Sequence, residues 1–227
     1  MGFSIAENLK AVKERVKATA LRAGRDPDNI KIVVVTKTID IDRIMEAISA
    51  GAEILGENRV QEAQKKVMSD ELRVMSDEVE WHLIGHLQTN KVKIAVRLFD
   101  LIHSVDSLHL SREIDGQAES IDKIQDILIE VNVSAEKSKY GIKPEELEEF
   151  LKDVSAFKNL DVKGLMTMPP FSENPEDSRY FFRHLKKLSQ EAGLKELSMG
   201  MSNDYEVAVE EGATMVRIGT AIFGERK

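Results

Sequence analysis

A lysine follows a buried, β-branched segment near the start of the chain. The run KIVVVTK covers residues 31–37 and ends at Lys37. Valine and isoleucine favour strands, so Lys37 is expected where a strand ends. A lysine that faces the mouth of a protein core is partly desolvated, which lowers the pKa of its ammonium and leaves an amine that can attack a carbonyl. Lys37 is therefore a candidate for covalent attachment of an aldehyde, although most lysines at strand ends are simply solvated.

A second group of residues, close to the C-terminal end of the sequence, could bind phosphate. Ser202 follows the run KELSM, and Gly219 and Thr220 follow ATMVRI. A serine can cap the N-terminus of a helix, and glycine leaves neighbouring backbone amides accessible to an anion. Taken singly, Ser202 also fits a plain helix cap and Gly219 a plain turn. Their coincidence with Lys37 favours the phosphate site.

Two further patterns are open to more than one interpretation. Asn58 stands where the second predicted helix begins, so it is a candidate N-cap as much as a ligand contact. His82 and His86 are four residues apart, which on a helix would suggest a metal site. The letters WHLI favour a strand, however, and no glutamate follows the first histidine. We therefore expect no metal.

Strands and helices alternate along the whole sequence and would position these residues. An opening helix is predicted by apolar residues at helical spacing after Ser4, which with Glu7 forms a capping box. Eight segments then have the composition of strands, and most are followed by a helical pattern. The predicted strands cover residues 31–37, 52–55, 80–85, 100–105, 126–133, 161–166, 195–199 and 213–218.

This alternation predicts the fold class. Strands that alternate with helices are parallel and joined by right-handed crossovers, and eight of them close into a (β/α)8 barrel. The alternative is an open doubly wound sheet, but no Gly-x-Gly-x-x-Gly follows the first strand. The eighth strand lacks a full helix after it, and the opening helix can take that place. We expect residues 1–227 to form a single α/β domain, a TIM-like barrel with an extra N-terminal helix.

Composition excludes several classes of function. The 227 residues carry a formal net charge of −8, whereas a general nucleic-acid binder needs a basic face. There is no cysteine, so disulfides and thiolate metal sites are excluded. The first ten residues lack the apolar run of a secretory signal, and no run approaches the length of a membrane span. We therefore expect a cytoplasmic protein without nucleic-acid or membrane partners.

Seven segments in a fixed order resemble the pyridoxal phosphate homeostasis protein family, of the YggS/PROSC type. The similarity spans nearly the whole chain, and one departure, Leu55 where phenylalanine is common, is a conservative packing change. The segments are VVVTKT, LGENRVQEA, WHLIGHLQTNK, IHSVDS, GLMTM, LSMGMSNDYEVAV and VRIGTAIFGER.

The resemblance implies a fold-type III barrel, similar to the N-terminal domain of alanine racemase, with pyridoxal 5'-phosphate held as a Schiff base on Lys37. It also implies phosphate contacts at Ser202, Gly219 and Thr220. Arg217 would lie beside the pyridine ring. Asn58 would lie near the cofactor, as a residue of the family motif.

The function implied is that of a cofactor reservoir or carrier, which influences amino- and keto-acid balance. Pyridoxal-phosphate-dependent apoenzymes would accept the cofactor from it. The alternatives are a pyridoxal-phosphate-dependent amino-acid racemase and an aldolase that uses Lys37. A racemase needs a second acid or base opposite the lysine, for which His86 or His103 are candidates. An aldolase would draw on Glu57 and Asp106. Without the β domain through which racemases pair, we expect a monomer.

Overall fold

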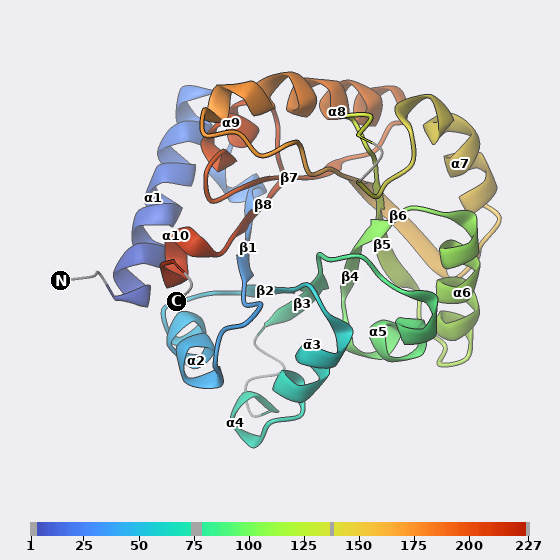
Figure 1. Ribbon diagram of the computed structural model, residues 1–227, viewed down its shortest axis with the longest axis horizontal. Coiled ribbons are helices and arrows are strands. Elements are labelled where there is room, and N and C mark those ends of the chain that lie inside the picture. Colours follow the sequence, from blue (N-terminus) through green and yellow to red (C-terminus); the bar gives the residue numbers. More distant parts are fainter. Residues whose placement is uncertain (1–3, 74–78, 137–138, 226–227) are drawn as a thin grey trace.

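Eight parallel strands close into a barrel in which each strand pairs with its neighbours in sequence and β8 pairs with β1 (Figure 1). The computed structural model describes residues 4–73, 79–136 and 139–225; Arg226, which ends the last family segment, lies outside them. The predicted barrel is confirmed. The strands are β1 (Lys31–Val35), β2 (Ile54–Glu57), β3 (Glu80–Leu83), β4 (Leu101–Val105), β5 (Gln125–Glu130), β6 (Leu160–Met166), β7 (Glu196–Met201) and β8 (Met215–Ile218).

Helices surround the barrel on its outer face (Figure 1). Three of the connections open with a short 3-10 turn before the α-helix, at Thr89–Lys91, Pro144–Glu146 and Pro175–Ser178. The α-helices are α1 (Ile5–Arg22), α2 (Ile41–Ser49), α3 (Val60–Val67), α4 (Asp70–Arg73), α5 (Val92–Leu98), α6 (Leu108–Glu119), α7 (Leu147–Val154), α8 (Arg179–Glu191), α9 (Tyr205–Glu210) and α10 (Thr220–Phe223).

The opening helix completes the outer ring. The predicted capping box is present, because Ser4 Oγ accepts from the backbone N–H of Glu7 and the Glu7 carboxylate accepts from the backbone N–H of Ser4. The buried face of α1 packs against α9 and α10. Since α10 is only four residues long, α1 covers the flank of the barrel that a full eighth helix would otherwise cover.

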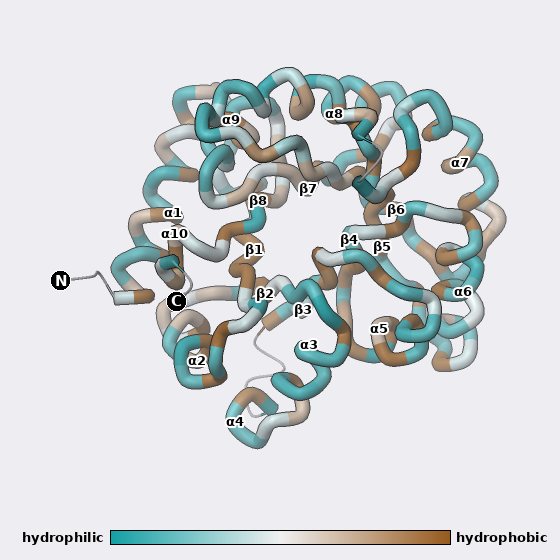
Figure 2. The backbone as a smooth tube through the Cα atoms, viewed as in Figure 1, coloured by the Kyte–Doolittle hydropathy of each residue, from teal (hydrophilic) through white to brown (hydrophobic). Residues whose placement is uncertain are grey.

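Side chains alternate between two apolar layers. One layer lies between the strands and the helices, and Figure 2 shows those helices with mixed hydrophobic and hydrophilic segments, as amphipathic helices have. The other layer fills the inside of the barrel. Its buried apolar members are Val33, Val35, Ile54, Ile84, Leu101, Leu128, Met166 and Met215.

Two predicted helix caps are wrong. Helix α3 begins at Val60, and Arg59 occupies the N-cap position without a side-chain cap bond. Asn58 stays in the loop because its backbone lies against Gly85, where an added Cβ would come 2.4 Å from the Asn58 carbonyl oxygen. Helix α9 begins at Tyr205 after Asp204, so Ser202 does not cap it.

The second strand is also displaced from its predicted place. It covers Ile54–Glu57 rather than residues 52–55, because the chain at Ala52 still closes the end of α2: its N–H donates to the Ala47 carbonyl at 2.9 Å. Within the described residues, no helix is long and apolar enough to cross a membrane.

Close contact between β6 and β7 predicts a strong effect of one glycine. A Cβ on Gly164 would lie 1.9 Å from the Glu196 carbonyl oxygen, and this backbone cannot move without opening the barrel. We expect Gly164→Ala to lower the free energy of unfolding by at least about 2 kcal/mol, measured by chemical denaturation.

Gly116→Ala is the matched control, because Gly116 is exposed on α6 and its added Cβ would meet nothing within 4 Å. It should raise stability by about 0.5–1 kcal/mol, the ordinary gain of alanine over glycine in a helix. Equal effects of the two substitutions would contradict the close packing of β6 on β7.

Candidate functional site

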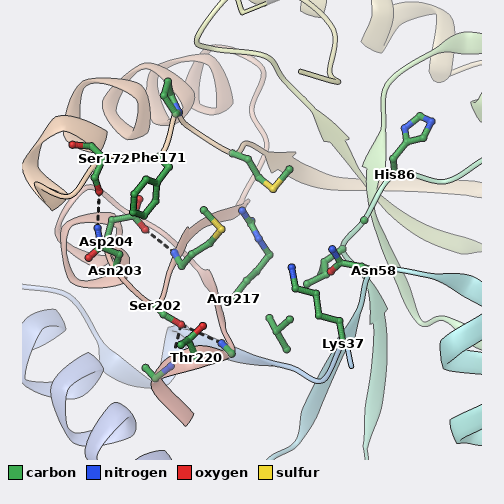
Figure 3. A pocket seen from close by; sticks show the side chains of 18 of the residues that line it. Lys37, Asn58, His86, Phe171, Ser172, Ser202, Asn203, Asp204, Arg217 and Thr220 are labelled. Carbon is green, nitrogen blue, oxygen red and sulfur yellow. Dashed lines mark hydrogen bonds between the residues drawn. The ribbon is translucent and has the colours of Figure 1, made fainter. Parts of the chain in front are cut away.

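A cavity of about 740 Å³ opens at the carboxyl ends of the barrel strands. Among the residues that line it are all six that the sequence singled out as cofactor contacts (Figure 3). Lys37 is the only lysine among the described lining residues. The six are Lys37, Asn58, Ser202, Arg217, Gly219 and Thr220.

The backbone on either side of Lys37 is held by a buried ion pair that the sequence did not reveal. Lys66 Nζ lies 2.6 Å from Glu57 Oε1 and donates to the Thr36 carbonyl at 2.7 Å. Thr36 Oγ1 also donates to Glu57 Oε1, at 2.7 Å. On the other side, Glu62 accepts from both Lys66 Nζ and the Thr38 N–H. This cluster fixes the peptide from which Lys37 extends.

Glu57 does not belong to the cavity. Its side chain is fully buried, and burial raises the pKa of its carboxyl against the opposing effect of Lys66. Glu57 is therefore not available in the cavity as the acid or base that the aldolase alternative would draw on. Its position follows from pairing with Lys66 of α3, which lies on the helix side of the barrel.

The Ser202 hydroxyl and two backbone amides converge between the ends of β7 and β8. Ser202 Oγ accepts from the N–H groups of Gly219 and Ala221, at 3.3 and 3.2 Å (Figure 3). Gly219 also lies close to the end of β1, where an added Cβ would come 3.3 Å from the Val35 carbonyl oxygen. Because both amides donate to Ser202 Oγ, the hydroxyl hydrogen of Ser202 is left to donate, and with the Thr220 hydroxyl it forms a site suited to an oxyanion.

Arg217 lies on the cavity floor and is almost completely buried, with 3% of its surface exposed. Nη1 donates to Ser198 Oγ at 2.6 Å, and Nη2 donates to the Thr167 carbonyl at 2.9 Å. Burial lowers the pKa of Arg217 to about 10, opposed by Glu130 and Asp204. The guanidinium therefore remains positively charged near neutral pH.

A carboxyl that the sequence analysis missed lines the same floor. Glu130 ends β5 and is 4% exposed. Burial raises the pKa of Glu130 to about 7; Asp106 adds to this increase and Arg217 opposes it. Glu130 can therefore take up or release a proton near neutral pH. One signal was available, since a lone glutamate in the apolar run DILIEVNV needs a reason to be there.

The opposite rim carries a histidine and a tyrosine. The rings of His86 and Tyr140 stack with centroids 3.8 Å apart and planes inclined by 11°, and His86 Nδ1 lies 3.6 Å from Asp106 Oδ2. Both rings line the cavity. The sequence analysis did not single out Tyr140, which lies outside the strands and lines the cavity from the segment between β5 and α7.

The remaining histidines of interest face elsewhere. His103 is fully buried inside the barrel and does not line the cavity, so it is not available as a second acid or base there. His82 bonds to His103 at 3.0 Å, whereas His86 faces the cavity, so the pair at i and i+4 does not share a site. In the described parts of the chain, no three histidine, aspartate or glutamate side chains gather as a metal site.

The chain is similar to known proteins over nearly its whole length. Residues 7–227 match the family described as alanine racemase, N-terminal domain. The pyridoxal phosphate homeostasis protein of Aquifex aeolicus is 47% identical, covering 99% of this chain and 100% of the relative. The one of Escherichia coli K12 is 40% identical, over 98% and 97% of the two chains.

Solved structures also align with this chain over most of its length. PipY of Synechococcus elongatus, in a structure with PLP bound, aligns with a TM-score of 0.81 at 32% identity, covering 97% of this chain and all of PipY. Alanine racemase of Clostridium difficile aligns with a TM-score of 0.72 at 16% identity, and the match covers 57% of the racemase, which shows a shared barrel fold. With near-complete coverage and high identity to several of its members, the chain belongs to the pyridoxal phosphate homeostasis protein family.

Proposed function

We propose that this protein binds pyridoxal 5'-phosphate in the cavity and acts in cofactor homeostasis, as a reservoir and carrier rather than as a turnover enzyme. The observation that carries the proposal is that one lysine, Lys37, shares the cavity with a buried arginine and with a cluster of hydroxyl and amide donors. The names of the relatives and the PLP bound to PipY support it.

The residues present fit this cofactor. The cavity volume of about 740 Å³ lies within the range for small-molecule sites. The cofactor carries an anionic phosphate, and the cavity contributes the cation Arg217 together with the donors around Ser202, while Lys37 supplies an amine for the aldehyde. Gly219 leaves the backbone accessible where the phosphate would approach.

Each of the six residues has a role in this proposal. Lys37 holds the aldehyde carbon covalently through its amine. Ser202, Thr220 and the Gly219 amide bind the phosphate, and Asn58 lies beside the cofactor. The chemistry that bound pyridoxal phosphate supplies is an aldehyde that amines capture reversibly.

Arg217 favours storage over turnover. A guanidinium only donates hydrogen bonds, so a ring nitrogen that faces Arg217 must accept and remain unprotonated. An unprotonated ring withdraws electrons less strongly than one kept protonated by a carboxylate. Two of the Arg217 donors are already committed to Ser198 and Thr167, which keeps the guanidinium in one place.

We further propose that the protein acts in the cytoplasm, that pyridoxal-phosphate-dependent apoenzymes accept the cofactor from it, and that it is a monomer. One observation supports the monomer: a single chain supplies every group assigned to the cofactor, so the site needs no partner subunit.

The alternative function, an amino-acid racemase, is favoured by two groups of the cavity. Glu130, with its pKa raised to about 7, could move a proton near neutral pH. The imidazole of His86, which lines the cavity beside Asp106, is a second group of a type that acts as acid or base. Proton transfer of this kind would need a group on the face opposite Lys37.

We expect no racemisation when the protein, loaded with pyridoxal phosphate, is incubated with L-alanine in D2O. Circular dichroism of the recovered alanine and deuterium at its α-carbon are the readouts. The Lys37→Ala variant is the control for free cofactor, which racemises amino acids slowly by itself. Turnover well above that control would establish the racemase instead.

Ser202→Ala tests the phosphate contacts. Loss of a hydroxyl that bonds a charged oxygen costs about 1.5–3 kcal/mol, so affinity for pyridoxal phosphate should fall by about tenfold or more. Affinity for unphosphorylated pyridoxal should hardly change, and equilibrium dialysis measures both.

Ser172→Ala is the matched control, since Ser172 also lines the cavity but its Oγ is bonded to Asp177 at 2.6 Å. This variant should keep the preference for the phosphorylated aldehyde. If Ser202→Ala keeps it equally well, the phosphate does not bind at Ser202.

A further inference from the structure

A continuous row of hydrogen-bonded side chains crosses the inside of the barrel below the cavity. Glu80 Oε2 lies 3.2 Å from His82 Nε2, and His82 Nδ1 lies 3.0 Å from His103 Nε2. His103 Nδ1 lies 2.9 Å from Ser198 Oγ, which accepts from Arg217 Nη1 at 2.6 Å. We call these five residues the interior chain.

The interior chain connects the two ends of the barrel. Glu80 is the first residue of β3, at the amino end of the strands, and 55% of its side chain is exposed. Arg217 lies on the cavity floor at the carboxyl end. The three residues between them are 0–1% exposed, and the step from His103 on β4 to Ser198 on β7 spans the barrel interior.

With one proton on each ring, the carboxylate at the Glu80 end sets the direction of the bonds. A guanidinium can only donate, and an ionised carboxylate can only accept. Ser198 Oγ accepts from Arg217, and its hydroxyl hydrogen remains available to donate to His103 Nδ1. His103 then carries its proton on Nε2 and donates to His82 Nδ1. His82 in turn carries its proton on Nε2 and donates to Glu80.

The opposite direction fails at the Glu80 end. If His103 donated from Nδ1 to Ser198, its Nε2 would accept from His82 Nδ1. The lone pair of His82 Nε2 would then face the Glu80 carboxylate, which is repulsive. Hydrogen bonding from His82 lowers the pKa of Glu80, so this group is a carboxylate near neutral pH.

A doubly protonated His103 ring is also disfavoured. Burial, the neighbouring His82 and the Arg217 charge together hold the pKa of His103 well below its usual value. His103 is therefore a neutral ring at neutral pH, with one donor and one acceptor nitrogen.

From these contacts we propose that Ser198, His103 and His82 are positioning residues for Arg217, and that Glu80 acts on the cavity floor from the far end of the barrel through them. Two of the five guanidinium donors are committed, to Ser198 and Thr167, which determines the donors that remain for a cavity ligand. These contacts lie within the protein itself and do not depend on whether pyridoxal phosphate is the ligand of the cavity.

Nitrogen-15 NMR of the ligand-free protein tests the direction of the chain. In protein labelled at histidine, the chemical shifts of the two ring nitrogens show which one carries the proton. Both rings should carry a proton on Nε2 and leave Nδ1 as the acceptor, and His82→Gln and His103→Gln variants assign their signals among the five histidines. A proton on Nδ1 of either ring would overturn the proposal.

Coupling along the chain is tested by removing the charge of Glu80. Glu80→Gln should shift the Nε2–H signals of both histidines and also the side-chain N–H signals of Arg217. Glu53→Gln is the matched control, because Glu53 is an exposed carboxylate beside Glu80 at the same end of the barrel. It should move none of these signals.

Ser198→Ala interrupts the chain by removing one buried oxygen. In this background, Glu80→Gln should still shift His103 but should no longer shift Arg217. If Glu80→Gln leaves the Arg217 signals unchanged when Ser198 is intact, Glu80 does not act on the cavity floor and the proposal is wrong.

Discussion

The buried charge of Arg217 is the constraint on which the cavity floor depends. Removing a cation from water costs several kcal/mol, and a protein interior tolerates it only when hydrogen bonds and opposite charge compensate. Ser198, the Thr167 carbonyl and the nearby Glu130 supply that compensation. Polar side chains therefore occupy a part of the barrel interior that would otherwise be filled by branched apolar residues. The interior chain down to Glu80 belongs to this group, because its side chains provide hydrogen bonds in the region of the buried Arg217 charge.

Lys66 and Lys37 differ in their roles. Lys66 is buried, bonded to two carboxylates and to the Thr36 carbonyl, and it holds the end of β1 in place. Lys37 extends from that fixed backbone into the cavity, where its amine is accessible to a ligand. A rigid base with a reachable amine suits covalent storage of an aldehyde, because the geometry for attachment exists before the ligand arrives.

The sequence predicted those parts of the structure that repeat or that depend on neighbours in the chain. Periodicity and the Ser4–Glu7 capping box are local signals, and they predicted α1 and the barrel correctly. Because the carboxyl ends of the strands meet at one face of a barrel, the six proposed cofactor contacts could be assigned to one site from the sequence. They do line one cavity. Their contacts with a cofactor remain a prediction. Tyr140, by contrast, reaches the rim through a loop, and the bonds from Arg217 to His103 join strands far apart in sequence. Patterns among neighbouring residues in the sequence do not predict contacts between residues that are far apart in the chain.

The central claim, that Lys37 is the attachment point for pyridoxal phosphate, is tested most directly by reducing the loaded protein with borohydride and mapping its peptides by mass spectrometry. Reduction makes an attachment between aldehyde and amine permanent and so marks the lysine that carries it. The account predicts one modified peptide, with the added mass on Lys37, and none in Lys37→Ala protein treated in the same way. A modified lysine elsewhere, with Lys37 unmodified, would contradict it.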